Sequence, residues 1–410
     1  MADFNMNTLV RRAVLSLTIV AFLLTPLSAE DWFRWRGPNL DGISSESDWD
    51  CDWPERKAVI AWRASVGIGY SSVVIADGRV FTIGHVDGHD VVHAFNESDG
   101  AIAWRFQYPA TLDDRDFEGG PTSTPTVDGE QVYVLSRAGE LFCLNVGTGE
   151  SIWQQSVAEL ADVRLPGWGC SAAPLVVGDR LLVNLGAAGA AVDKKTGELI
   201  WSSEDREAGY ATPVVMPESN PPAAIFASGK AYVAVEIETG RQLWSERWLT
   251  SFNCNAAGPI ISEQRMFLSS GYNRGAALFE LGNEAPKLIW KSKEMKNQIH
   301  GSILYEGCLY GLHGDMEAGA RLRCMDWKTG EVRWSEDDLQ PGGIMLAGER
   351  LILLTESGEL VVAPADAEVW RPIAKTKVVD GKCWTGPVLS NGRIYCRSIQ
   401  GELVCIDCRS

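Results

Sequence analysis

Ala191-Val-Asp193-Lys-Lys-Thr196-Gly197-Glu-Leu-Ile-Trp201 is one copy of an eleven-residue pattern that recurs along this 410-residue chain and decides its fold. The other clear copies share the small first residue, the Gly at position seven and the closing tryptophan, and they end at Trp104, Trp153, Trp244 and Trp334. The Gly suits a positive φ, and the acidic or amide side chain at position three can satisfy the backbone of a tight turn. Each copy therefore predicts a hairpin whose outgoing strand carries a large flat ring.

A second pattern precedes the first in most copies. Pro125-Thr-Val-Asp128-Gly129 and Pro174-Leu-Val-Val-Gly178 are apolar runs that end in a turn and are followed by a second apolar run, which predicts another hairpin. Together the two patterns make a unit of four antiparallel strands that repeats every forty to fifty residues. Such a period, with no helical periodicity outside the N-terminus, predicts an all-β repeat architecture.

The tryptophans give the number of repeats. Eight of them close a complete or degenerate copy: Trp62, Trp104, Trp153, Trp201, Trp244, Trp290, Trp334 and Trp370. We expect each ring to cover the small residue of the adjoining repeat. Trp62 lacks upstream strands, and the last copy, residues 385–407, lacks a tryptophan, so the strand at 59–64 should complete that copy. The sequence thus predicts an eight-bladed β-propeller closed by pairing of N-terminal and C-terminal strands.

The sequence divides into three predicted segments. Residues 1–29 have Arg11-Arg12, an apolar run and Ser28-Ala29, which is typical of a cleaved signal peptide; residues 30–56 form an N-terminal arm, and residues 57–410 form the propeller. The mature chain has no other run of about 20 apolar residues, so no transmembrane segment is expected. We therefore expect an exported protein, periplasmic or extracellular. Its formal net charge of −17 argues against nucleic acid as a partner; it favours solubility, or alternatively a surface for a basic partner or cations.

The repeat resembles the tryptophan-docking motif of the pyrroloquinoline-quinone (PQQ) repeat propellers. That superfamily includes the quinoprotein alcohol dehydrogenases and the propeller lipoprotein of the outer-membrane β-barrel assembly machinery. Trp32-Phe-Arg-Trp35-Arg36-Gly37-Pro38-Asn39 also resembles a segment that precedes such propellers in secreted planctomycete proteins. The resemblance implies the fold over about residues 57–410, but one fold hosts both enzymes and scaffolds. The residue directly after Ala29 is Glu30 and not a cysteine, so the lipid anchor of the assembly protein is not expected.

The cysteines and histidines do not form a convincing metal or redox motif. Cys143, Cys324 and Cys405 occupy the small-residue position of the repeat, where they look like buried substitutes for alanine. Cys51 is a plausible partner for a disulfide, but the pairing of the ten cysteines cannot be deduced from sequence. His85, His89 and His93 surround an Asp87-Gly88 turn and, on strands, are too widely spaced for a single ion.

The predicted ligand site lies where the chain enters the inner strand of each blade, because these segments gather around one mouth of the central channel. Aromatic and amide side chains there could line a pocket; the candidates are Trp168, Tyr210, Asn253, Asn255, His300 and Trp384. His300 is the histidine among them and is expected to titrate near neutrality. The alternative is that these residues merely line a structural opening.

Two functions remain open, and the sequence leaves open whether the protein is an enzyme. We favour a non-catalytic, monomeric scaffold that binds a protein partner or a small ligand at the channel mouth, with no catalytic residue, metal or cofactor assigned. The alternative is a PQQ-dependent alcohol or sugar dehydrogenase using PQQ with calcium. Against it, the chain has no adjacent Cys-Cys pair, no transferable calcium-ligand set, and is shorter than those enzymes.

Overall fold

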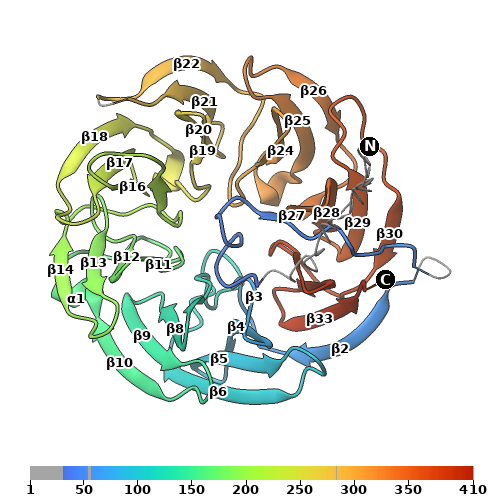
Figure 1. The fold of residues 1–410 in the computed structure, drawn as a ribbon, viewed down its shortest axis with the longest axis horizontal. Helices are drawn as coiled ribbons and strands as arrows, with labels where there is room; N and C mark the ends of the chain where they lie inside the picture. Colours follow the sequence, from blue (N-terminus) through green and yellow to red (C-terminus); the bar gives the residue numbers. More distant parts are fainter. Residues whose placement is uncertain (1–30, 54–56, 283, 410) are drawn as a thin grey trace, which may run out of the picture.

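The computed structural model describes residues 31–53, 57–282 and 284–409, and its strands form eight sheets arranged radially around a central axis (Figure 1). The predicted eight-bladed propeller is therefore confirmed. The predicted signal peptide, residues 1–29, lies outside the described residues. Among the described residues, no helix has the length and apolar character needed to cross a membrane.

Each blade has four antiparallel strands that are numbered outward from the axis in blades 1 to 7, and β1 (Ile43–Ser44) adds a fifth, parallel strand to the sheet of blade 7. Blades 1 to 4 are formed by β3 (Val74–Ala76), β4 (Arg79–Val86), β5 (His89–Asn96) and β6 (Ile102–Pro109); β7 (Thr126–Asp128), β8 (Gln131–Leu135), β9 (Glu140–Asn145) and β10 (Ser151–Ser156); β11 (Leu175–Val177), β12 (Arg180–Val183), β13 (Ala190–Asp193) and β14 (Leu199–Ser202); and β15 (Val214–Met216), β16 (Ala223–Ala227), β17 (Ala231–Glu236) and β18 (Gln242–Arg247).

Blades 5 to 8 follow the same plan, and short helical turns occur only in connections of the described chain. The strands are β19 (Ile260–Ser262), β20 (Arg265–Ser270), β21 (Gly275–Glu280) and β22 (Lys287–Ser292); β23 (Ile303–Tyr305), β24 (Cys308–His313), β25 (Arg321–Asp326) and β26 (Val332–Glu336); β27 (Pro341–Ala347), β28 (Arg350–Thr355), β29 (Glu359–Pro364) and β30 (Ala374–Lys377); and β31 (Val388–Ser390), β32 (Arg393–Arg397), β33 (Glu402–Asp407) and β2 (Val59–Ser65). The helical turns are α1 (Val157–Leu160), η2 (Ser251–Asn253) and η3 (Met316–Ala318).

The ring closes as the sequence predicts. β2 pairs antiparallel with β33, so that Val59 lies opposite Asp407 and Trp62 opposite Cys405. Figure 1 shows β2, from the start of the described chain, completing the outer side of the blade that ends the chain. Because the N-terminal strand and the last three strands of the chain thereby share one sheet, β2 covers the outer edge of β33.

The repeated tryptophan joins each blade to the next one. Trp201 of β14 donates its indole Nε1 hydrogen to Ile237 O of blade 4 at 2.9 Å, and its ring lies against Gly240 in the turn of that blade. Gly240 has a φ of +72°, and a Cβ there would lie 2.6 Å from the ring, so both the backbone and the contact require glycine. Trp104 makes the same bond to Val146 O at 2.9 Å. Each ring is thus a packed contact between neighbouring blades.

Two details of the docking prediction are wrong. The small residue belongs to the same blade as the tryptophan: Ala191 lies directly opposite Trp201, and a β-bulge follows at Val192. The glycine turn, rather than the small residue, is what the ring covers on the adjoining blade. In addition, Trp370 precedes β30 and packs on Trp334 of blade 6, with ring centroids 5.9 Å apart. β30 therefore has no docking tryptophan, and its pairing with β29 has no bulge.

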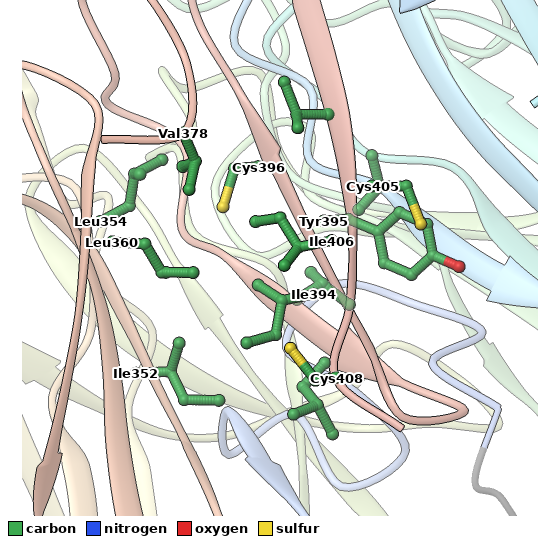
Figure 2. Packing of buried hydrophobic residues seen from close by; sticks show 14 of the residues in the cluster. Ile352, Leu354, Leu360, Val378, Ile394, Tyr395, Cys396, Cys405, Ile406 and Cys408 are labelled. Atoms are coloured by element: carbon green, nitrogen blue, oxygen red, sulfur yellow. The ribbon is translucent and has the colours of Figure 1, made fainter. Parts of the chain in front are cut away.

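Apolar side chains fill the space between adjacent blades. Figure 2 shows this packing between blades 7 and 8, where Ile352, Leu354 and Leu360 face Ile394 and Cys396. These side chains are at most 1% exposed. Since neighbouring blades share such layers all around the ring, the blades stabilise one another and hold the innermost strands in fixed positions.

The N-terminal arm, residues 31–53, crosses the central channel in Figure 1. Trp32 O accepts a hydrogen bond from Ile75 N of blade 1 at 2.9 Å, and β1 (Ile43–Ser44) pairs in parallel with β27. Trp32 and Trp49 are each 3% exposed, which is less than the 9% of Trp201. These arm tryptophans are therefore at least as deeply buried as the docking tryptophans, because the arm is packed into the propeller.

Candidate functional site

The segments that lead into the inner strands are hydrogen-bonded to one another around the channel mouth. Thr385 Oγ1 donates to Tyr70 O at 3.3 Å, which connects blade 8 to blade 1. Ser171 Oγ donates to Tyr210 O at 3.1 Å, connecting blade 3 to blade 4. These bonds link side chains and backbone of successive blades, so the mouth is a preorganised frame that does not depend on a single flexible loop.

Inside this frame lies a cavity of about 210 Å³. Its lining is mainly aromatic and small polar, and the rings come from blades on all sides: Trp35, Tyr70, Phe117, Trp168, Tyr210, Tyr272 and Trp384. The remaining polar lining includes threonine and serine hydroxyl groups and the amide of Gln298. A concave, largely aromatic surface with a few placed polar groups is the usual form of a small-ligand site.

Trp35 of the arm closes the inner end of the cavity. The same side chain borders a second, smaller space deeper in the channel, which is lined by Leu40, Val214 and Ile260. The neighbouring Arg36 fixes the arm, because its guanidinium donates to Gly301 O and Ser302 O, both at 2.8 Å. Trp35 thus lies between the cavity at the mouth and the smaller space in the channel.

Four of the six predicted residues line this cavity: Trp168, Tyr210, His300 and Trp384. Asn253 and Asn255 do not belong to its lining. Asn253 donates to Glu207 Oε2 at 2.7 Å, and Asn255 is fully buried, with its amide bonded to Ser228 O and Trp248 O. The residues between and after them, Cys254 and Ala256, line the cavity instead. Asn253 ends the turn η2 with a left-handed φ of +53°, and the amide bonds of Asn255 hold its side chain away from the cavity.

His300 does not titrate near neutrality, which corrects the expectation from sequence. Burial, together with the nearby Arg36 charge, lowers the pKa of His300 to about 4. Its Nε2 donates to Trp384 O at 2.7 Å, and its ring stacks on Trp35. His300 is therefore a neutral structural element of the cavity wall at neutral pH.

The sequence reading missed several aromatic residues at the mouth. Phe117 and Tyr70 contact each other edge-to-face at 5.6 Å, and Phe252 lies between Trp168 and Tyr272 at 6.1 and 5.5 Å. Phe252 is 69% exposed and has a φ of +58°. An exposed aromatic residue with left-handed backbone is strained, and such strain is concentrated at binding surfaces. The sequence offered one signal for these aromatic residues: they lie close to the segments that lead into the inner strands.

Trp168 is held in place by contacts from both sides of the mouth. Its carbonyl accepts from the Arg137 guanidinium at 3.0 Å, and its backbone N donates to the Tyr210 hydroxyl at 3.3 Å. Its indole Nε1 donates to Asp116 Oδ2 at 3.3 Å. Trp168 thus presents a fixed ring rather than a mobile one, which reduces the entropy lost when a ligand stacks on it.

Two acidic residues, Asp116 and Glu317, complete the lining. Asp116 lies in the connection between blades 1 and 2, whereas Glu317 lies in η3 of blade 6, on the opposite side of the eight-bladed ring. Both are exposed at the mouth. The lining contains neither lysine nor arginine. Its formal charge is therefore negative.

The other histidines and the cysteines considered in the sequence analysis do not form a site. In the described part of the chain, no group of three or more His, Cys, Asp or Glu side chains has the arrangement of a metal site. His85 pairs with Asp90 at 2.9 Å, and His93 Nε2 donates to Val66 O at 3.1 Å. All ten cysteines are free and buried, so the structure contains no disulfide between Cys51 and another described cysteine.

The protein is thus an eight-bladed propeller with an aromatic cavity at the mouth of its central channel. The family model described as outer membrane protein assembly factor BamB matches residues 88–336, and the chain belongs to this family. The chain is 24% identical to the BamB of Shewanella oneidensis over 306 residues, which cover 72% of this chain and 70% of the relative.

Solved structures show the same fold. BamB from Moraxella catarrhalis superimposes with a TM-score of 0.64 at 17% identity, covering 86% of this chain and all of that one. The quinohemoprotein alcohol dehydrogenase of Comamonas testosteroni gives 0.68 at 14% identity, covering 92% and 80%. Because an assembly factor and an oxidoreductase are equally similar in fold, the fold does not select between binding and catalysis.

Proposed function

We propose that the protein is an exported, non-catalytic binding scaffold that receives a protein partner or a small ligand at the mouth of its central cavity. The observation that carries the proposal is the aromatic cavity at the channel mouth. Trp35 closes one end, and a frame of hydrogen-bonded segments holds stacking surfaces open at the other. The signal peptide expected at residues 1–29 and the membership of an assembly-factor family support export and a partner-binding role.

The chemistry of the lining supports binding rather than acid–base catalysis. A general base works best when its pKa lies near the operating pH, whereas the pKa of His300 is lowered to about 4. The Tyr210 hydroxyl has a pKa raised to about 12 by burial. Neither group is suited to accept or donate a proton repeatedly at neutral pH.

The residues of the cavity do not fit PQQ with calcium, the cofactor of the alternative function. PQQ carries carboxylate groups, yet the cavity lining offers the carboxylates of Asp116 and Glu317 and no lysine or arginine to balance them. A calcium ion needs six to eight oxygen ligands, and the described residues contain no cluster of that kind. We therefore derive no reaction step through this cofactor.

The binding function is tested by site-specific photocrosslinking. A photoreactive benzoylphenylalanine replaces Phe252, which is exposed beside the cavity, or Leu288, which is 53% exposed on the outer strand of blade 5. In the native host we expect a discrete crosslinked product from position 252 and none from position 288. Equal labelling at both positions, or none at 252, would contradict the mouth as the contact region.

A second measurement addresses the enzyme alternative directly. Purified protein is assayed for dye-linked oxidation of alcohols and sugars with added PQQ and calcium, alongside Trp168→Ala. We expect no PQQ-dependent turnover. Turnover that requires PQQ and disappears in the variant would replace the scaffold by an oxidoreductase.

A further inference from the structure

We propose that the cavity recognises an organic cation, either an alkylammonium or a guanidinium group. The cation can be a free molecule or the end of a lysine or arginine side chain of a partner, since both present the same chemistry. This inference rests on the proposed function of the mouth and specifies what enters it. Three features of the cavity lead to it: it is lined by several aromatic rings, its two carboxylates form no salt bridge, and a lysine of the protein already makes such a contact beside it.

The rings supply the first feature. Aromatic faces carry a negative quadrupole, so a cation is attracted to them most strongly where several rings surround it and water is excluded. Trp168, Tyr210 and Tyr272 line one side of the cavity, and Trp384, Tyr70 and Phe117 line the other. A ring lies under the pocket as well, since Trp35 forms its floor. Lys382 and Arg137 already lie over the rings of Trp384 and Phe117, so Trp168, Tyr210, Tyr272 and Tyr70 are the surrounding rings that a ligand cation would meet.

The carboxylates supply the second feature. Asp113 and Glu118, close to the mouth, are neutralised by Arg137 at 2.8 Å and by Lys382 at 2.9 Å. Asp116 and Glu317, which line the cavity itself, form no salt bridge within 4.0 Å with any described residue. They accept hydrogen bonds from neutral donors: Trp168 Nε1 to Asp116 at 3.3 Å and Gln298 Nε2 to Glu317 at 3.0 Å. The acidic groups that a ligand would meet are the ones left without a cation.

Lys382 is the internal example. Its Nζ lies 3.5 Å from the centroid of the Trp384 ring and 2.9 Å from Glu118 Oε1. The Tyr70 hydroxyl donates to the other oxygen of the same carboxylate. An ammonium group is therefore already held beside this cavity by one ring and one carboxylate. Trp168 with Asp116 offers the same combination: Arg137 is bonded to the Trp168 carbonyl, but among the described residues no cation lies over the Trp168 ring or within 4.0 Å of the Asp116 carboxylate.

The charges below the cavity indicate where the cation would be placed. Arg36 lies beyond Trp35, where its guanidinium is bonded to backbone carbonyls, and the His300 ring beside it is neutral. Repulsion by Arg36 disfavours a cation at the floor, whereas Asp116 and Glu317 attract it at the mouth. The cavity of about 210 Å³ is smaller than the roughly 300–1,000 Å³ of drug-sized ligand sites, which suits a head group with a short apolar stem.

The inference is tested by isothermal titration calorimetry with matched charged and neutral probes. Choline is compared with 3,3-dimethyl-1-butanol, which has the same shape without the charge, and n-butylammonium with 1-butanol. To test the polypeptide source, a short Gly-Ser peptide with one central arginine is compared with its citrulline counterpart. We expect at least one cation of these pairs to bind with saturation, its neutral counterpart to bind at least about tenfold more weakly, and affinity to fall as salt increases.

Variants assign the binding to the two carboxylates. Asp116→Asn with Glu317→Gln keeps an oxygen to accept each neutral hydrogen bond but removes both charges, and it should weaken the cation about tenfold. Glu150→Gln with Glu331→Gln removes the same charge from exposed outer turns and should leave the affinity within about twofold. A melting temperature near that of the unmodified protein shows that the variants are folded.

Each outcome decides the proposal. Binding by choline or butylammonium alone indicates a free cation, and binding by the arginine peptide alone indicates a partner side chain; both support it. The proposal is overturned if no cation binds up to about 10 mM, if the neutral probes bind as well, or if the Asp116 and Glu317 variant binds normally. Crosslinking at position 252 with no cation binding would leave the scaffold function standing and remove only this inference.

Discussion

Trp35 of the N-terminal arm stacks on His300, which leads into blade 6, with ring centroids 6.3 Å apart and an angle of 27° between the rings. The residues that follow each of them are also joined, because Arg36 donates to Gly301 O at 2.8 Å. The arm is thus attached to the propeller at the position where it closes the channel. This contact connects the start of the described chain to the shape of the cavity.

The first prediction concerns ring closure. Deleting residues 30–64 removes both the arm and most of β2, which exposes the edge of β33 and removes Trp62 from the packing between blades 8 and 1. We expect aggregation that is visible by light scattering, since an exposed strand edge is a template for pairing. Deleting only residues 30–42 retains β2 and should give a soluble but less stable protein. An unchanged melting temperature in the longer deletion would show that the closure is not needed.

The second prediction concerns tryptophans of the propeller and the arm. Trp201→Ala and Trp244→Ala should each lower the free energy of unfolding by about 3–5 kcal/mol, the usual range for a buried aromatic residue. Trp32→Ala and Trp49→Ala should cost a similar amount, because those rings are 3% exposed. Trp370→Ala, in a half-buried connection, is the control and should cost less. Chemical denaturation measures all five variants.

Much of the fold was predictable because its determinants are local. The turn around Gly197 is specified by neighbours in sequence: Asp193 Oδ1 accepts from Lys195 N and Thr196 N, and Gly197 has a φ of +75°. Repetition of such a turn with a tryptophan allows the blades to be counted. Trp370 shows where this fails, because the spacing alone does not reveal that its ring precedes the strand instead of lying in it.

The site was less predictable because it depends on contacts between distant segments. Asn253 and Asn255 were expected to face the ligand, but their side chains are bonded to Glu207 and Ser228, which lie 46 and 27 residues away in the sequence. The neutral state of His300 depends on burial by an arm that is far away in sequence. Neither relationship leaves a pattern in the residues around the site.

The third prediction concerns the thiols. All ten cysteines are free and buried, and burial raises the pKa of Cys170, Cys254 and Cys383 to about 12. Because the thiolate is the reactive form, we expect no rapid reaction of the native protein with Ellman's reagent and release of ten equivalents after unfolding. A reductant should not change the melting temperature. Fewer than ten titratable thiols in the unfolded, unreduced protein would reveal a disulfide.

The fourth prediction concerns pH. The pKa of His300 falls from its ordinary 6.5 to about 4 in the folded protein, because burial disfavours the charged ring. Between these values the unfolded chain binds a proton that the folded protein does not, so stability increases with pH. The contribution is fully present above pH 6.5 and is lost as pH falls through about 4, amounting to about 3 kcal/mol for this side chain.

His300→Gln isolates this contribution, since a glutamine amide can still donate to the Trp384 carbonyl but does not titrate. The free energy of unfolding is measured by denaturant titration at intervals from pH 4 to pH 7.5. We expect the slope of stability against pH to be shallower in His300→Gln, with the remaining slope due partly to His93 and His313, whose pKa values are also lowered to about 4. His89→Gln, at the start of β5, is the matched control substitution. If the unfolding free energy of the unmodified protein and of His300→Gln had the same dependence on pH, the pKa of His300 would not be lowered by folding. The arm would then not bury the His300 ring in solution.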